Sequence, residues 1–221
     1  MSDIFREVDE DLRRERAEKL WKQYGPALMG AAALIVAATA GYVGWERWQT
    51  RREAERTALL AQTVDKATEA AAGGGDLQNA VAALAGVADQ LDGAHATLAR
   101  LQQAGLLARQ GDTAGAVALY DRIAGDGSND PLFRELAQLL SVLHQIDGGD
   151  PAQLRARLQP LLAPTNPWRH SARELAGLLA AKAGDRAAAH GLFQQIVNDA
   201  EAPAGVRSRA ADLAALYAEQ K

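Results

Sequence analysis

The chain has 221 residues, of which 48% are hydrophobic, 24% are charged and 5% are aromatic, and its formal net charge at pH 7 is −4. Ala and Leu dominate the apolar residues, so the composition favours helices over sheets. The charges form no basic face of the kind that nucleic acid requires, and the lack of cysteine in the sequence excludes disulfides, thiolate nucleophiles and cysteine-ligated zinc.

Residues 26–45, with the sequence PALMGAAALIVAATAGYVGW, carry no charge and are predicted to form a transmembrane helix. Twenty helical residues extend about 30 Å, the thickness of the hydrocarbon core of a bilayer. Aromatic residues occur at both edges of the stretch, as they do at membrane interfaces: Trp21, Tyr24, Tyr42, Trp45 and Trp48. Two alternatives stay open. One is a buried Ala-rich helix of a soluble protein, and the other is a signal peptide cleaved after Ala38-Thr39-Ala40.

Residues 1–25 precede the predicted span and are expected to be cytoplasmic. More basic residues occur within 20 residues of the span on this side (Arg6, Arg13, Arg14, Arg16, Lys19 and Lys22) than on the other (Arg47, Arg51, Arg52 and Arg56). Because basic flanking residues stay in the cytoplasm, this small excess places the C-terminal part of the chain on the opposite side of the membrane.

One face of the predicted span carries small residues, which let a second helix approach closely in lipid. They recur at helical spacings of three and four: Gly30, Ala33, Ala37, Gly41 and Gly44. This face is a candidate for packing between membrane helices, although Ala and Gly are frequent throughout the chain. Residues 46–72 lack Pro and Gly, so the helix is expected to continue as a stalk until Gly73, Gly74 and Gly75 end it.

Residues 76–221 are predicted to form a repeat domain, because a Gly-Asp dipeptide recurs along them. The four dipeptides begin at Gly75, Gly111, Gly149 and Gly184, at intervals of 36, 38 and 35 residues. Each Asp is placed to cap a helix, and Pro151 fits a first helical position. Five, nine and twelve residues after each Gly, every position is apolar: Ala80, Ala116, Leu154 and Ala189; Leu84, Tyr120, Leu158 and Phe193; Val87, Ile123, Leu161 and Ile196. Because these spacings define one helix face, the sequence predicts an all-α tetratricopeptide-like solenoid of helical hairpins.

The solenoid is expected to end in a C-terminal capping helix over PAGVRSRAADLAALYAEQK. Its polar positions are Arg207, Arg209, Asp212 and Glu219, and its expected buried positions are Val206, Ala210, Leu213, Leu216 and Tyr217. The second and fourth hairpins match tetratricopeptide positions at the small residue after the turn and at the aromatic residue. Gly177 also matches the glycine of the leading helix in that repeat. The first and third hairpins are degenerate, and the first shares its leading helix with the stalk.

This order of parts resembles a bacterial inner-membrane family, the ancillary subunit of the Sec translocon. The residues that carry the resemblance are RRERAEKLWKQYGPALMGAAALIVAATAGYVGWERWQTRREAE, and the opening MSDIFREVDEDLRRERAEKLWKQYG is similar to the alphaproteobacterial branch. The resemblance implies an inner-membrane protein whose periplasmic repeats work beside the translocon and periplasmic chaperones or nascent polypeptides. It supplies no catalytic motif.

The sequence itself offers no catalytic, cofactor or metal site. His95, His144, His170 and His190 lack the spacing of a helix-borne metal site and are expected at the surface or in a groove. The stretch GDGSNDP at 125–131 lacks the alternating acids of a calcium loop and is expected to be a turn between repeats. No cofactor is therefore expected, and the protein is predicted to be a scaffold rather than an enzyme.

The leading helices of such repeats usually supply the binding surface. Helix positions place a possible peptide groove at Leu98, Leu101, Gly105 and Ala108 in the second hairpin and at Glu174, Leu178 and Lys182 in the fourth. Such an apolar groove suits an unfolded or amphipathic segment. The alternative is that these residues form the core between helices. For the whole protein, two functions stay open: a scaffold beside the Sec translocon, or an accessory subunit of another envelope complex for cell division, cell-wall synthesis or respiration.

Overall fold

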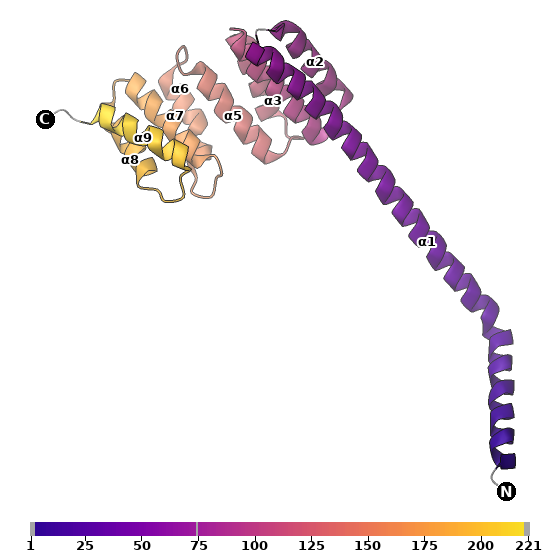
Figure 1. Cartoon of the computed structure of the whole chain (residues 1–221). Coiled ribbons are helices and arrows are strands. Elements are labelled where there is room, and N and C mark those ends of the chain that lie inside the picture. Colours follow the sequence, from indigo (N-terminus) through magenta and orange to yellow (C-terminus); the bar gives the residue numbers. More distant parts are fainter. Residues whose placement is uncertain (1–2, 74, 219–221) are drawn as a thin grey trace. The chain divides into compact units, whose positions relative to one another are not determined.

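A computed structural model describes residues 3–73 and 75–218, except for the side chains of residues 3–13, 15–17, 27, 28 and 31–33. Within these ranges every regular element is a helix, as the sequence predicts (Figure 1). The elements are α1 (Asp3–Gly73), α2 (Leu77–Gln90), α3 (Gly93–Arg109), α4 (Thr113–Gly125), α5 (Pro131–Gln145), α6 (Pro151–Leu158), the 3-10 helix η1 (Gln159–Leu162), α7 (Arg169–Lys182), α8 (Arg186–Val197) and α9 (Ala204–Tyr217).

The chain divides into two compact units, Met1–Glu55 and Arg56–Lys221, and the division falls inside α1. The second unit therefore begins within the predicted stalk of residues 46–72, earlier than the predicted start at residue 76. The reason is hydrophobic packing, because Leu60 clusters with Val87 of α2 and Ala99 of α3. Ala67 likewise clusters with α2 and α3 residues. The end of α1 thus serves as the leading helix of the first hairpin.

The first unit consists of α1 residues, and its large apolar side chains are exposed: Leu20, Trp21, Tyr24, Met29, Leu34, Ile35, Val36, Tyr42, Val43, Trp45 and Trp48. Gly30, Gly41 and Gly44 have open space where a side chain would begin, and Ala37 is exposed. The side chain of Ala33, the remaining member of the predicted packing face, falls outside the described set. Across the residues that the structure describes, no helix is both long enough and apolar enough to cross a membrane.

The predicted helix caps of the second unit are confirmed at all four Gly-Asp sites. Each Asp side chain accepts a hydrogen bond from the backbone N–H three residues later, over 3.0 Å at Asp76, 2.8 Å at Asp112, 2.8 Å at Asp150 and 2.9 Å at Asp185. Such a bond satisfies one of the backbone donors that a helix N-terminus leaves free. Gly111 and Gly184 adopt φ angles of 87° and 82°, which a side chain would disfavour.

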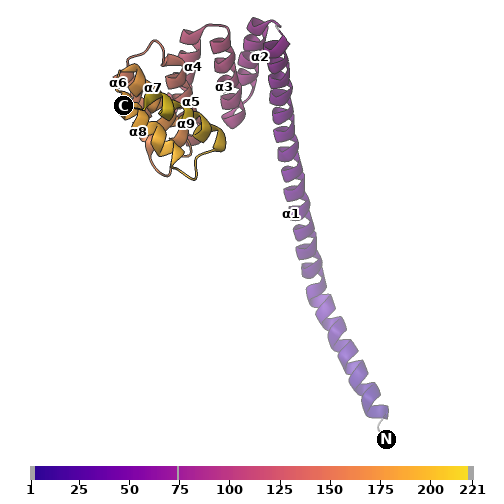
Figure 2. The same ribbon diagram turned by 60° about the vertical axis from the view of Figure 1, so that its left-hand side comes forward.

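The predicted apolar face of each trailing helix forms the core. The four faces together comprise twelve predicted positions, of which Ala80 is half-buried and the other eleven are buried. Successive helices α2 to α5 and α7 to α9 pack side by side in chain order (Figures 1 and 2). The leading helices α3, α5, α7 and α9 also contact one another in sequence, which is the arrangement of a helical-hairpin solenoid.

The predicted terminal helix is α9, which packs on α8 and α7. Ala210 and Ala214 are buried, and Val206, Leu213 and Tyr217 pack against the same cluster as Phe193. The prediction for Leu216 is wrong, because its side chain is 63% exposed. It lies beyond the stripe that faces α8. Glu219 falls outside the described part of the chain.

Candidate groove on the leading helices

The predicted groove residues of α3 face two directions. Leu101 is buried in a cluster with Ala104 and Tyr120, and Leu98 and Ala108 pack against this cluster. These contacts are those of the alternative interpretation, a core between helices. Gly105 differs from the other three because it also lines a surface cavity. Whether any of these residues binds a peptide stays a prediction.

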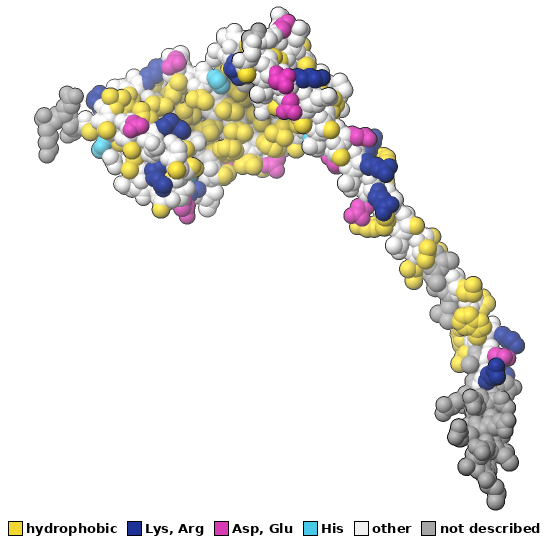
Figure 3. Space-filling view, viewed as in Figure 1, with side chains coloured by type: hydrophobic (Ala, Val, Ile, Leu, Met, Phe, Trp, Pro, Cys, Tyr) yellow, Lys and Arg dark blue, Asp and Glu magenta, His cyan; other side chains and the backbone are white. Residues whose placement is uncertain are grey.

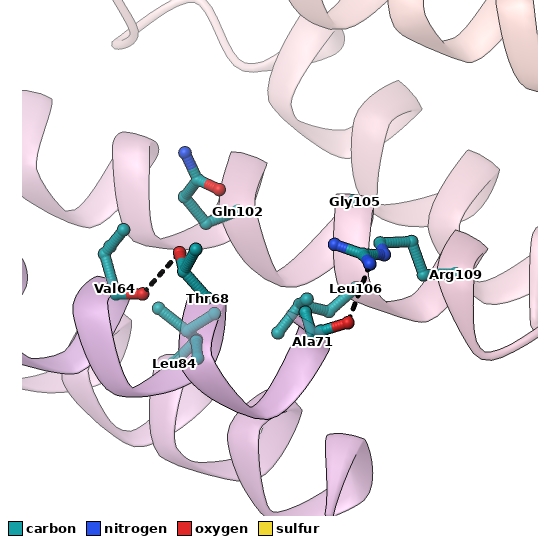
Figure 4. A pocket seen from close by; sticks show the side chains of 9 residues that line it. Val64, Thr68, Ala71, Leu84, Gln102, Gly105, Leu106 and Arg109 are labelled. Atoms are coloured by element: carbon teal, nitrogen blue, oxygen red, sulfur yellow. Dashed lines mark hydrogen bonds between the residues drawn. The ribbon is translucent and has the colours of Figure 1, made fainter. Parts of the chain in front are cut away.

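The cavity has a volume of about 160 Å³ and lies between the end of α1, α2 and α3 (Figure 4). Its apolar lining comes mainly from Val64, Ala67 and Ala71 of α1, Leu84 of α2 and Leu106 of α3. Thr68, Gln102 and Arg109 add polar groups. Gln102 and Arg109 were not among the predicted groove residues, although their separation of seven positions places them on one face of α3.

Two of the cavity's polar side chains are held by backbone carbonyl groups of α1. Arg109 Nη2 donates to the carbonyl oxygen of Ala71 over 2.9 Å, and Thr68 Oγ1 donates to the carbonyl of Val64 over 2.8 Å (Figure 4). Arg109 thereby satisfies a carbonyl in the last turn of α1, where such groups lack helical partners. An apolar recess with a positive group beside it can accept an apolar side chain from a partner and pair with a nearby carboxylate.

The predicted groove residues of α7 connect neighbouring hairpins. Glu174 accepts two hydrogen bonds from Arg209 of α9, over 2.8 and 2.9 Å, and this pairing raises the pKa of Arg209. Lys182 Nζ donates to the carbonyl oxygens of Ile146, over 2.6 Å, and Asp147, just after α5. Leu178 packs against two core clusters. The structure therefore places these three residues in contacts between repeats.

Helix α5 exposes an apolar stripe that the sequence analysis did not single out. Leu132 and Leu143 are 44% and 41% exposed, and Leu136 between them is half-buried. Their spacings of four and seven put them on one helix face. Hydrophobic side chains gather over this part of the repeat unit (Figure 3). Trp168 reaches the same helix, because its Nε1 donates to the carbonyl of Leu132 over 3.3 Å.

His170 corrects the prediction that all four histidines lie at the surface or in a groove. It is only 5% exposed, and neither ring nitrogen has a hydrogen-bond partner. Its Nδ1 lies 3.6 Å from Asp199 Oδ2, which is also 3.5 Å from Arg173 Nη1. Burial, and next the Arg169 guanidinium, lower the pKa of His170. The backbone N–H of Glu201 lowers the pKa of Asp199 by hydrogen bonding to it.

The loop between α4 and α5 is a turn, as predicted for GDGSNDP. Asp126 Oδ1 accepts hydrogen bonds from the backbone and side chain of Ser128, which lower the pKa of Asp126, and Asp130 caps α5. Within the part of the chain that the structure describes, no group of three His, Cys, Asp or Glu residues is arranged to hold a metal.

These features define a helical-hairpin repeat protein with a recess between its first leading helices. A profile of the tetratricopeptide repeat-like domain matches residues 18–215. The chain therefore belongs to the tetratricopeptide repeat-like domain family, whose fold is typically that of a non-catalytic scaffold for protein–protein interaction. Neither a curated protein nor a solved structure matches the chain significantly.

Proposed function

We propose that the chain is a scaffold anchored in the bacterial inner membrane, whose periplasmic repeats bind proteins beside the Sec translocon and periplasmic chaperones. Residues 26–45 are the single span and residues 1–25 are cytoplasmic. The observation that carries this proposal is α1, which joins an uncharged stretch with exposed large apolar side chains to a packed repeat unit without a break. In lipid, such side chains need no protein cover.

The anchor is further supported by the distribution of charge along α1. Yellow apolar side chains lie between two groups of charged side chains on this helix (Figure 3). Lys19 and Lys22 precede the uncharged residues, and Arg47 and Arg51 follow them. The family match begins at residue 18, so it includes this part of α1 as well as the hairpins.

Protein binding is supported by two apolar surfaces of the repeat unit. One is the recess at Gly105, and the other is the α5 stripe of Leu132, Leu136 and Leu143. A recess of about 160 Å³ accommodates about one side chain rather than a cofactor. The partner we propose is therefore a polypeptide, either a chaperone surface or a nascent chain in transit.

The partner is identified by crosslinking in cells followed by purification of the full chain in mild detergent. Recovery of translocon subunits with periplasmic chaperones is the expected result. Recovery of a division, cell-wall or respiratory complex without translocon subunits would replace the proposal with the alternative accessory role. A variant with Leu132→Asp serves to map the contact, because it places a charge at an exposed position of the apolar stripe and should reduce recovery of the partner.

Topology and retention of the anchor require separate measurements. A reporter that fluoresces only in the cytoplasm, fused after Lys221, is expected to stay dark. The intact chain is expected in carbonate-washed membranes with its original N-terminus. Bright cells would reverse the orientation, and a mature N-terminus at Gly41 would identify a cleaved signal peptide instead of an anchor.

The small-residue face is tested with Gly41→Leu, which adds bulk but keeps the span apolar. We expect the variant to remain in the membrane and to recover less of its membrane partner, because close helix packing is lost. Thr39→Leu is the matched control, since it adds bulk about 160° away around the helix. Equal recovery of the partner by the wild type and Gly41→Leu would leave recognition to the repeats alone.

A further inference from the structure

Two tryptophans and one arginine lie against one another along α1 at the C-terminal end of the uncharged stretch. The ring centroids of Trp45 and Trp48 are 5.4 Å apart, and Arg52 Cζ lies 4.4 Å from the centroid of Trp48. Spacings of three and four place the three side chains on one side of the helix. Both rings are exposed. We call Trp45, Trp48 and Arg52 the aromatic–basic cluster.

The guanidinium of Arg52 lies a short distance along the helix axis from Trp45, the end of the uncharged stretch. The Arg52 backbone lies seven residues beyond Trp45, or about 10 Å along the helix axis. Its side chain, however, reaches back over Trp48, which is only about 4.5 Å beyond Trp45. Since the headgroup layer on each side of a bilayer is about 5–7 Å thick, the guanidinium falls within that layer when residues 26–45 span the core.

The chemistry of the cluster fits a phosphate group. A guanidinium placed over an indole ring is attracted by the ring's quadrupole, and its remaining N–H groups can donate to a phosphate. Within the described part of the chain, no carboxylate lies within salt-bridge distance of Arg52. Residues 45–56 contain four arginines (Arg47, Arg51, Arg52 and Arg56) and three acids (Glu46, Glu53 and Glu55). The local charge is therefore positive, and it complements an anionic headgroup.

We propose that the aromatic–basic cluster binds the phosphate of an anionic phospholipid headgroup, with the indoles against the lipid and Arg52 donating to the phosphate oxygens. This inference rests on the membrane anchor of the proposed function. It adds a specific lipid site to that anchor, and the site fixes the depth of α1 at the C-terminal end of the span. An indole ring suits this position because its body is apolar and its N–H requires a polar partner.

The test uses the full chain purified in mild detergent and titrated with phosphatidylglycerol or phosphatidylcholine, with bound lipid counted by native mass spectrometry. Wild type should retain phosphatidylglycerol in preference to phosphatidylcholine. Arg52→Gln should weaken retention about fivefold, the factor expected for one basic contact with an anionic lipid surface. Arg47→Gln is the matched control. It removes the same charge about 140° away around the helix and should change retention less than twofold.

Several results would overturn the lipid site. Equal loss by Arg47→Gln and Arg52→Gln would show diffuse attraction, and displacement of the lipid by millimolar inorganic phosphate would show a general anion site. Unchanged lipid retention by Arg52→Gln, with loss of a crosslinked protein in cells, would show a partner contact instead. Carbonate washing separates this inference from the anchor. Wild type that resists washing but shows no Arg52 effect refutes only the lipid site, whereas wild type that is washed off refutes both.

Discussion

The fourth hairpin, α7–α8, and the third, α5–α6, fill the space between their two helices in different ways. In the fourth, a Cβ atom at Gly177 would lie 2.6 Å from Phe193 Cε1, so the aromatic ring occupies the volume that the glycine leaves free. In the third, Val142 and Leu158 occur at the same separation and are both completely buried in one cluster. The comparison shows that the fold constrains the combined volume of the facing side chains rather than each residue.

The trailing helices of the two hairpins differ as well. Helix α8 has 12 residues, whereas α6 has eight and passes into the 3-10 helix η1, where Pro160 is the second residue. Proline supplies no N–H for an α-helical bond, so it ends the α-helix early. Leu161 nevertheless remains buried at the position that Ile196 occupies in the fourth hairpin. The third hairpin therefore has the same buried position although its trailing α-helix is shorter.

The largest expected effect comes from removing the volume of the trailing-helix residue. We expect Phe193→Ala to lower the free energy of unfolding by about 4 kcal/mol, and Leu158→Ala by about 3 kcal/mol, because each leaves a cavity. Urea unfolding of the full chain in mild detergent, followed by circular dichroism, measures both. A loss below about 1 kcal/mol for Phe193→Ala would mean that the ring contributes little to the packing of the fourth hairpin.

A second test replaces the facing residues of the fourth hairpin, Gly177 and Phe193, with the residue types of the third hairpin, Val and Leu. We expect Gly177→Val alone to lower the free energy of unfolding by about 1–3 kcal/mol, because its side chain overlaps Phe193. The double variant Gly177→Val with Phe193→Leu should recover at least about 1 kcal/mol relative to the sum of the single changes. Additive losses in the same urea titrations would show that volume is not exchanged between these positions.

The two Asp caps should contribute equally to the free energy of unfolding, although the cores of the two hairpins differ. Asp185→Ala and Asp150→Ala are each expected to lower the free energy of unfolding by about 1 kcal/mol, because each removes the acceptor of a helix N-terminal N–H. Asp212→Ala, at an exposed position inside α9, is the control and should change it by less than about 0.5 kcal/mol. A control variant that loses as much as the cap variants would point to charge rather than capping.

The smallest expected effect is that His170 makes the free energy of unfolding depend on pH. Burial and Arg169 lower the pKa of His170 below its ordinary value of about 6.5. The unfolded chain therefore takes up this proton first, and the free energy of unfolding falls as the pH drops below about 6.5. His170→Gln should flatten the change in urea midpoint between about pH 7.5 and pH 5. Identical slopes in the two proteins would contradict the assignment.

The sequence predicted the parts of the fold that depend on short-range chemistry. The four Asp caps follow from the Gly-Asp turns, and the buried face of each trailing helix follows from three spacings that recur with the repeat. Gly177, which the sequence matched to a glycine of the tetratricopeptide leading helix, is the position that Phe193 approaches closely in the structure. These features lie within one hairpin, where chain connectivity limits the possible contacts.

The orientation of the leading helices was harder to predict. Helix α3 has apolar residues around much of its circumference, so its sequence does not distinguish the side that meets α4 from the side that lines the recess. Leu101 and Ala108 consequently pack on the α4 side and Leu98 packs on both sides, whereas Gln102 and Arg109 line the recess. The burial of His170 depends on Asp199 and Glu201 in the loop after α8, and spacing alone does not indicate that contact.

Polar contacts between residues about one repeat apart join neighbouring hairpins of the second unit, in addition to the hydrophobic core. Arg109 with Ala71, Lys182 with Ile146 and Arg209 with Glu174 join residues 38, 36 and 35 positions apart. Each connects neighbouring leading helices near the surface, beside hydrophobic clusters that also continue from one hairpin to the next. Because salt screens exposed charges, we expect these contacts to hold neighbouring hairpins together less strongly as ionic strength rises.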